Sequence, residues 1–212
     1  MNGSSIKLWL LFPCVLLALA MAACSSTESS QARAAALEYM SLRTPVEHPV
    51  FNSLAITRIE SFQKGSIVIF SYELGTGTEP GHPGDRVMVL IRLDQSGKRI
   101  GGGAIGDIVF LKGDPVQIAW TWLGTPEQEM YAYYGPVSDS RIAAVELVEF
   151  DGSTSRVDTR GKRVFFLPRV YPGPFRSAFE THRPPQALRA FDASGLLVYE
   201  KRFSSPGSPN AS

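Results

Sequence analysis

Ser66-Ile67-Val68-Ile69-Phe70-Ser71-Tyr72-Glu73 is the stretch of sequence that says most about the fold. Apolar side chains occupy both sets of alternating positions, as in a central strand that is covered on both faces. After a loop rich in glycine, proline and threonine at residues 75–85, a second segment alternates, with Val87, Val89, Ile91 and Leu93 on one face. The first segment predicts a central strand of a β-sheet, and the second predicts another strand with one apolar face.

Other short apolar segments predict strands along most of the remaining chain. They lie at residues 54–60, 116–123, 129–134, 141–150, 163–167, 187–192 and 196–201. The chain has 19 glycines and 15 prolines, which fall between these segments and favour turns. The sequence therefore predicts a mainly β fold, an antiparallel sandwich or open barrel of about ten short strands.

One short helix is expected before the strands. Residues 32–43 have high helix propensity, and Ala36, Tyr39, Met40 and Arg43 approximate one helical face. Pro45 should end the helix. Residues 25–31 are polar and predict a tether, and residues 204–212 predict a disordered tail. The expected organisation is a tether and helix at 24–45, a β-rich domain at 46–203, and the tail.

Two turns share the sequence Asp-x-Ser-Gly, at Asp94–Gly97 and Asp192–Gly195. The Asp carboxylate can accept hydrogen bonds from the turn, and Gly accommodates a positive φ, so both predict hairpins with a G1 bulge. Asp151-Gly152 predicts a third hairpin, of the two-residue form. Turn chemistry is favoured over calcium binding because no spaced series of Asp and Asn follows.

The first 24 residues differ in character from the rest. Residues 1–7 are polar and include Lys7, and residues 8–21 are apolar throughout. This pattern predicts a signal peptide at residues 1–23, because the apolar run is shorter than the roughly 20 residues that cross a bilayer.

Met21-Ala22-Ala23-Cys24 resembles the lipobox of bacterial lipoproteins, a family defined by its processing signal and not by its fold. Met21 departs from the leucine usual there. The resemblance implies cleavage before Cys24 and diacylglycerol on its thiol, which anchors the chain on the outer face of the cell membrane, or the outer membrane in a Gram-negative host. Two acyl chains suffice for stable anchoring. A plain signal peptide cut at Ala-x-Ala and an uncleaved anchor are the alternatives.

The net charge of the chain argues against some classes of binding partner. The chain has 21 Lys+Arg and 20 Asp+Glu, and removal of residues 1–23 takes away only Lys7. A chain without net charge lacks the excess of basic residues that is typical of nucleic-acid-binding proteins. No basic run would hold it on an anionic membrane surface. The expected partners are the membrane, through lipid on Cys24, and an envelope protein or glycan.

No catalytic or metal motif is found. His48, His82 and His182 lie near prolines without the close spacing of a zinc site, and no Gly-x-Ser-x-Gly occurs. Gly101–Gly106 lacks the Lys-Ser/Thr of a phosphate loop. Among paired acids, Glu127 and Glu129 share a face, whereas Glu146 and Glu149 should point to opposite sides of a strand. We expect no metal and no cofactor.

Aromatic side chains supply the candidate ligand-binding residues. Trp120 and Trp122 share one strand face, as do Tyr131 and Tyr133, and a hairpin at residues 124–128 would bring all four together. Exposed, they would form a stacking platform for a sugar or peptide. Buried, they are core, which is the favoured reading for large aromatics.

The segment Tyr134–Val145, which follows the two tryptophans, is similar to a Tyr-Gly-x-Val/Ile-x-Asp-x-x-Ile-x-x-Val pattern in small exported proteins of Gram-positive bacteria with no established activity. The likeness spans residues 120–203. It implies a β-rich extracytoplasmic domain and assigns no active residue.

The leading hypothesis is a lipid-anchored, non-catalytic β-domain that binds a partner or ligand in the envelope. The alternatives are an envelope hydrolase whose site forms only in the fold, and a structural protein that meets another protein through a strand edge.

Overall fold

The computed structural model describes one helix and most of the β-rich region. The described residues are 29–44, 48–75, 85–100, 108–109, 114–122, 129–171 and 185–203. Several predicted features lie outside them: the signal peptide, Cys24, the tail at 204–212, Gly101–Gly106, Glu127, His82 and His182.

The described strands form three antiparallel sheets, none of them closed. The helix-side sheet has the order β1-β2-β3-β4, with β1 (Pro49–Phe62), β2 (Gly65–Leu74), β3 (Arg86–Asp94) and β4 (Ile108–Val109). The middle sheet has the order β5-β6-β9, with β5 (Ala119–Trp122), β6 (Glu129–Pro136) and β9 (Val164–Tyr171). The outer sheet has the order β11-β10-β7-β8, with β7 (Ala144–Val148), β8 (Thr154–Asp158), β10 (Ala187–Phe191) and β11 (Leu197–Arg202).

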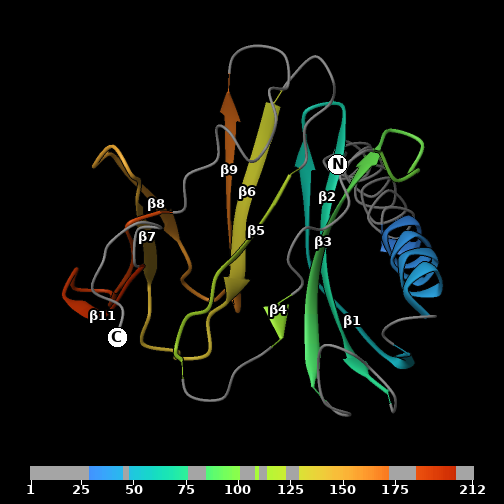
Figure 1. Ribbon diagram of the computed structural model, residues 1–212, viewed down its shortest axis with the longest axis horizontal. Coiled ribbons are helices and arrows are strands. Elements are labelled where there is room, and N and C mark those ends of the chain that lie inside the picture. Colours follow the sequence, from blue (N-terminus) through green and yellow to red (C-terminus); the bar gives the residue numbers. More distant parts are fainter. Residues whose placement is uncertain are drawn as a thin grey trace, which may run out of the picture.

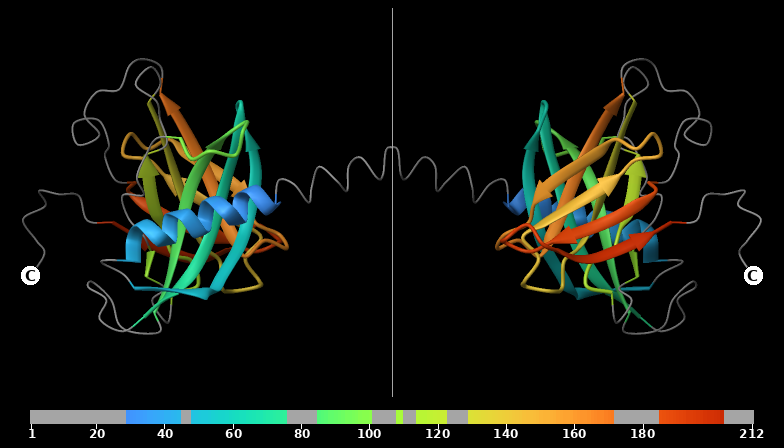
Figure 2. Two further views of the ribbon diagram at one scale, coloured as in Figure 1. Left: turned by 90° about the vertical axis from the view of Figure 1, so that its right-hand side faces the viewer. Right: turned by 90° about the vertical axis from the view of Figure 1, so that its left-hand side faces the viewer.

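These elements stack in four layers. The helix lies on one side, followed by the helix-side, middle and outer sheets (Figure 1). Figure 2 shows the stack from its two ends, with the helix in front in the left view and the outer sheet in front in the right view. The predicted mainly β fold with an N-terminal helix is confirmed.

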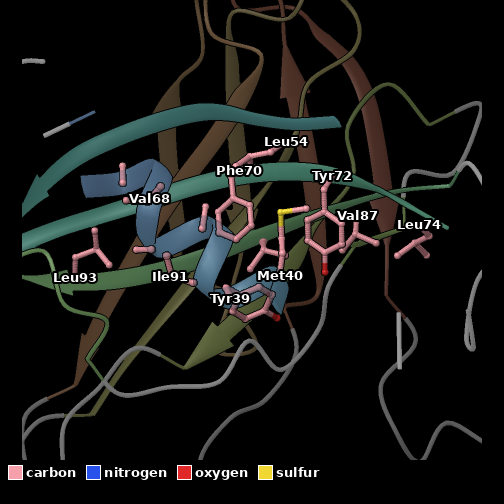
Figure 3. Packing of buried hydrophobic residues seen from close by; sticks show 14 residues of the cluster. Tyr39, Met40, Leu54, Val68, Phe70, Tyr72, Leu74, Val87, Ile91 and Leu93 are labelled. Carbon is pink, nitrogen blue, oxygen red and sulfur yellow. The ribbon is translucent and has the colours of Figure 1, made fainter. Parts of the chain in front are cut away.

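The first core lies between the helix and the helix-side sheet. Val68, Phe70 and Tyr72 of β2 point toward Tyr39 and Met40 of the helix (Figure 3). The rings of Tyr39 and Phe70 meet edge to face, with centroids 5.7 Å apart. The buried stripe of the helix also includes Ala32, Ala35 and Ala36.

Two further cores separate the sheets, because the inner strands bury both faces. Ile67 and Ile69 of β2 pack with Met130 and Tyr134 of β6 between the helix-side and middle sheets. The alternate residues of β6 face the other way, and Tyr133 packs against the outer sheet. Members of this third core from the outer sheet are Val145, Leu147, Leu188 and Ala190.

Some boundaries differ from the prediction. The helix begins at residue 29, inside the predicted tether, and ends at residue 44 directly before Pro45. It is an integral layer of the core, because its apolar face covers a sheet. Strand β8 was not predicted, since Thr154–Asp158 is polar apart from Val157. β4 is too short to leave a pattern.

The two Asp-x-Ser-Gly turns have matching geometry, as predicted. Gly97 and Gly195 have φ of 82° and 87°. Each Asp carboxylate accepts hydrogen bonds from the Ser backbone N–H and hydroxyl two residues on, and from the backbone N–H of residue 98 or 196. The Ser hydroxyl bond holds the pKa of Asp94, and likewise of Asp192, below its usual range.

The Asp151-Gly152 turn differs from the hairpin form that the sequence predicted. It does not have the two-residue form, because the Glu149 N–H donates to the Ser153 carbonyl at 2.8 Å and the Gly152 N–H to the Glu149 carbonyl at 3.0 Å. These bonds repeat those of the two Asp-x-Ser-Gly turns, and Gly152 also has a φ of 82°. Gly152 takes the left-handed position of a G1 bulge.

Candidate functional site

The four aromatic residues do meet. β5 and β6 pair antiparallel, with Trp120 opposite Tyr133 and Trp122 opposite Tyr131. The rings of Trp120 and Tyr131 lie 5.9 Å apart at 58°. Tyr131 and Tyr133 are each 1% exposed, whereas both tryptophans are half-buried. Tyr133 belongs to the core against the outer sheet and Tyr131 is fully buried, so of these four residues only the tryptophans offer surface to a ligand.

A more open site lies where the middle and outer sheets meet. The turns at residues 137–142 and 159–163 enclose a hollow of about 550 Å³. The backbone fixes both turns, since the Val137 N–H donates to the Arg163 carbonyl and the Thr159 N–H to the Ala143 carbonyl, each at 2.8 Å. Gly161 has a φ of 70°, which suits the tight second turn.

The hollow has an apolar floor and a polar rim. Val137, Ile142 and Thr159 are buried. Lys162 and Arg163 are exposed at the rim. An apolar base with a few convergent charged groups is typical of ligand pockets.

The rim carries a net positive charge. Asp139 also lines the hollow, but the Arg141 guanidinium hydrogen-bonds its carboxylate and lowers the pKa of Asp139 to about 2. Lys162 and Arg163 form no ion pair with a carboxylate of the described residues, whereas exposed Arg141 and Arg160 each form one. The lining therefore carries two cations against the single carboxylate of Asp139, and nearby Asp158 also attracts Lys162 electrostatically.

A second hollow of about 540 Å³ lies at the adjacent end of the outer sheet. It is lined by Arg156 and Arg160, and also by Asp158 and Asp192. Arg160 binds Asp158, and Arg156 stacks over the Phe191 ring at 4.3 Å from its centroid. Because its cations have partners, this hollow has less electrostatic attraction for an anion than the first.

The paired acids Glu146 and Glu149 each bind a different arginine. The Glu149 carboxylate accepts from the Arg169 guanidinium at 2.8 and 3.0 Å, on the side of the middle sheet. Glu146 accepts from Arg189 at 3.4 Å, within the outer sheet. The two carboxylates thus bind arginines of different sheets, but the predicted alternation across one strand does not apply, because β7 ends at Val148. His48 is exposed, with a φ of 45°.

Sequence reasoning did not find Lys162 and Arg163. Arg163 was placed at the start of a strand, and the two turns of the hollow are about twenty residues apart in the chain. One signal was present, because the Tyr134–Val145 segment singled out in the sequence contains the floor residues Val137 and Ile142.

Comparison with protein-family models, curated proteins and solved structures finds no significant match for this chain. Within the described ranges, no helix has the length and apolar character needed to cross a membrane. Across those same ranges, no three His, Cys, Asp or Glu side chains are grouped so as to hold a metal ion.

Proposed function

We propose that this protein is a lipid-anchored, extracytoplasmic β-domain that binds an anionic group of an envelope ligand in the hollow between residues 137–142 and 159–163. The anchor part of the proposal rests on the lipobox-like Met21–Cys24 sequence. The binding part rests on one observation: Lys162 and Arg163 lie at the rim above an apolar floor and form no ion pair with a carboxylate of the described residues.

The chemistry of the rim indicates the kind of group that would bind. Arg presents a planar fork that matches a carboxylate or phosphate, and Lys adds a point charge. Val137 and Ile142 would contact an apolar portion of the same ligand. The role is binding, because none of these lining side chains is a nucleophile held beside a base.

The binding part can be tested with octanoate, a carboxylate with an apolar chain. NMR titration of the chain from residue 24, with Cys24→Ser, should shift the backbone amides of residues 137–142 and 159–163. The Lys162→Ala/Arg163→Ala double variant should lose these shifts, whereas Arg202→Ala, an exposed arginine of β11, should keep them. Absence of localised shifts in the parent chain would contradict this site.

The anchor part needs a separate measurement. The intact mass of the full chain expressed in a bacterium should show a chain that begins at Cys24 and carries diacylglycerol. The Cys24→Ala variant should lose this addition and leave the membrane fraction. A soluble, unlipidated parent chain would overturn the anchor and leave the hollow untouched.

A further inference from the structure

The distance from the predicted anchor to the folded domain is short. The described helix begins at residue 29, so residues 25–28 separate it from Cys24. An extended chain spans at most about 3.6 Å per residue, which limits the separation between Cys24 and residue 29 to roughly 18 Å. A lipid on Cys24 would therefore hold the start of the helix near the bilayer surface.

Two turns of the helix-side sheet lie at this same end of the molecule. A Cβ built on Gly97 would lie 3.0–3.1 Å from the Gln31 side chain, so the 94–98 turn packs against the first turn of the helix. Asp94 pairs with Gly65 of β2, which directly follows the turn at Gln63 and Lys64. The helix start and both turns thus form one continuous end of the domain.

This end exposes basic side chains that are far apart in sequence. Arg33, Lys64 and Lys98 are exposed, and none forms an ion pair with a carboxylate of the described residues. The Asp94 carboxylate lies at the same end, where it accepts hydrogen bonds from the backbone amides of Ser96 and Lys98 and attracts the Lys98 ammonium, so the three cations outnumber this one carboxylate. Although the sequence has no basic run, the fold gathers these three cations, and we name them, with the helix start, the basic end.

We propose that the basic end lies against the anionic headgroups of the membrane, with the outer sheet turned away from it. The proposal rests on the proposed lipid anchor at Cys24. Charge complementarity supports it, because Lys and Arg near an anionic leaflet are attracted to it within about a Debye length. The layer order supports it as well, since the middle sheet and helix-side sheet separate the outer sheet from the helix (Figure 1).

Orientation can be measured on the lipidated protein. Cys14 would leave with the signal peptide and the Cys24 thiol would be lipidated, so an introduced cysteine is the one free thiol of the mature chain. Gln95→Cys lies at the basic end, and Ser194→Cys lies in the β10–β11 turn of the outer sheet; both positions are exposed. A fluorophore on residue 95 should be quenched by headgroup spin-labelled lipid, and one on residue 194 should not. Equal quenching, or stronger quenching at residue 194, would overturn the orientation.

A second experiment tests the face without the anchor. The chain from residue 24 with Cys24→Ser should sediment at low salt with vesicles of equal parts phosphatidylcholine and phosphatidylglycerol, and not with pure phosphatidylcholine. The Arg33→Gln/Lys64→Gln/Lys98→Gln variant should bind about 100-fold more weakly, at about fivefold per charge.

The matched control removes the same charge from the outer-sheet side. Arg156→Gln/Arg160→Gln/Arg202→Gln should bind the anionic vesicles as the parent chain does. An equal loss of binding in both triple variants would overturn the proposal, because binding would then depend on the net charge of the protein and not on the basic end. The lipid anchor is tested separately, by the intact mass of the full chain. An unlipidated chain that still shows face-specific vesicle binding contradicts the anchor alone.

Discussion

The helix-side sheet and the outer sheet are both four-stranded and antiparallel, yet they are stabilised differently. In the helix-side sheet, neighbouring residues of β3 enter different cores: Leu90 packs toward the middle sheet and Ile91 toward the helix. In the outer sheet one face is core, and the other is solvent-facing and charged. Strand pairing therefore does not determine burial; the layers above and below each sheet determine it.

The solvent-facing side of the outer sheet carries a row of alternating charge. The strand register places Arg156 opposite Glu146, Glu146 opposite Arg189, and Arg189 opposite Glu200. The row crosses all four strands, so each inner charge has an opposite charge on both sides. Cross-strand pairs of opposite charge stabilise a sheet modestly, and here they replace the apolar cover that the helix supplies elsewhere.

The largest expected effect tests the two-sided burial of the helix-side sheet. Leu90→Ala and Ile91→Ala should each lower the free energy of unfolding by about 2–5 kcal/mol, because both side chains are fully buried. Urea denaturation of the two variants measures this. A near-neutral result for either one would show that the corresponding face is not covered.

The same comparison of neighbours in the outer sheet should give unequal results. Leu147→Ala should again cost about 2–5 kcal/mol. Glu146→Ala should cost about 1 kcal/mol or less, because partly exposed ion pairs contribute little. The Glu146 effect should shrink at high salt, and the Leu147 effect should not. Equal losses, both independent of salt, would contradict the one-sided model of this sheet.

The two Asp-x-Ser-Gly turns offer a smaller, matched test across the two sheets. Asp94→Ala and Asp192→Ala each remove the acceptor of three hydrogen bonds. Both should lower the urea midpoint by similar amounts, since the turns share one geometry. Asparagine at either position retains an acceptor oxygen and should restore most of the loss. A large difference in urea midpoint between the two alanine variants would mean that the packing around each turn, and not the hydrogen bonds of the turn itself, determines the loss of stability.

Acid should weaken the outer-sheet side gradually. Hydrogen bonds from Arg141 and Arg160 lower the pKa values of Asp139 and Asp158 to about 2. Their pKa in the unfolded chain is about 3.9. The stabilisation is therefore present above about pH 4 and is lost as the pH falls toward 2. Urea midpoints between these pH values should fall less steeply in the Asp139→Asn/Asp158→Asn variant.

Much of the fold could be predicted because its strongest local patterns agree with its tertiary structure. The two-sided apolar character of residues 66–73 predicted a central strand, and β2 is buried on both faces. Helix propensity and the spacing of Tyr39 and Met40 located the helix. Strand β8 was missed because an edge strand with one apolar side chain resembles a loop.

The candidate site was less accessible to sequence reasoning. Trp120 and Tyr133 were correctly brought together, because a short hairpin is a local feature. Their burial depends on the outer sheet, which lies above them and comes from later in the chain. Lys162 and Arg163 are ordinary turn cations in sequence, and only the fold shows that they line one hollow and form no ion pair with a described carboxylate.

The middle sheet has a consequence for how the molecule opens. Tyr133 and Tyr134 are neighbours in β6, yet each belongs to a different core. A slip of β6 by one residue would exchange every side chain between the two cores at once. Separation of the outer sheet would expose the Tyr133 face of β6, and the burial of that face fixes which residues of β6 point toward the helix-side sheet. We therefore expect the amides of the three sheets to undergo hydrogen exchange through one cooperative opening of the molecule. The amides that exchange most slowly should lie in β6.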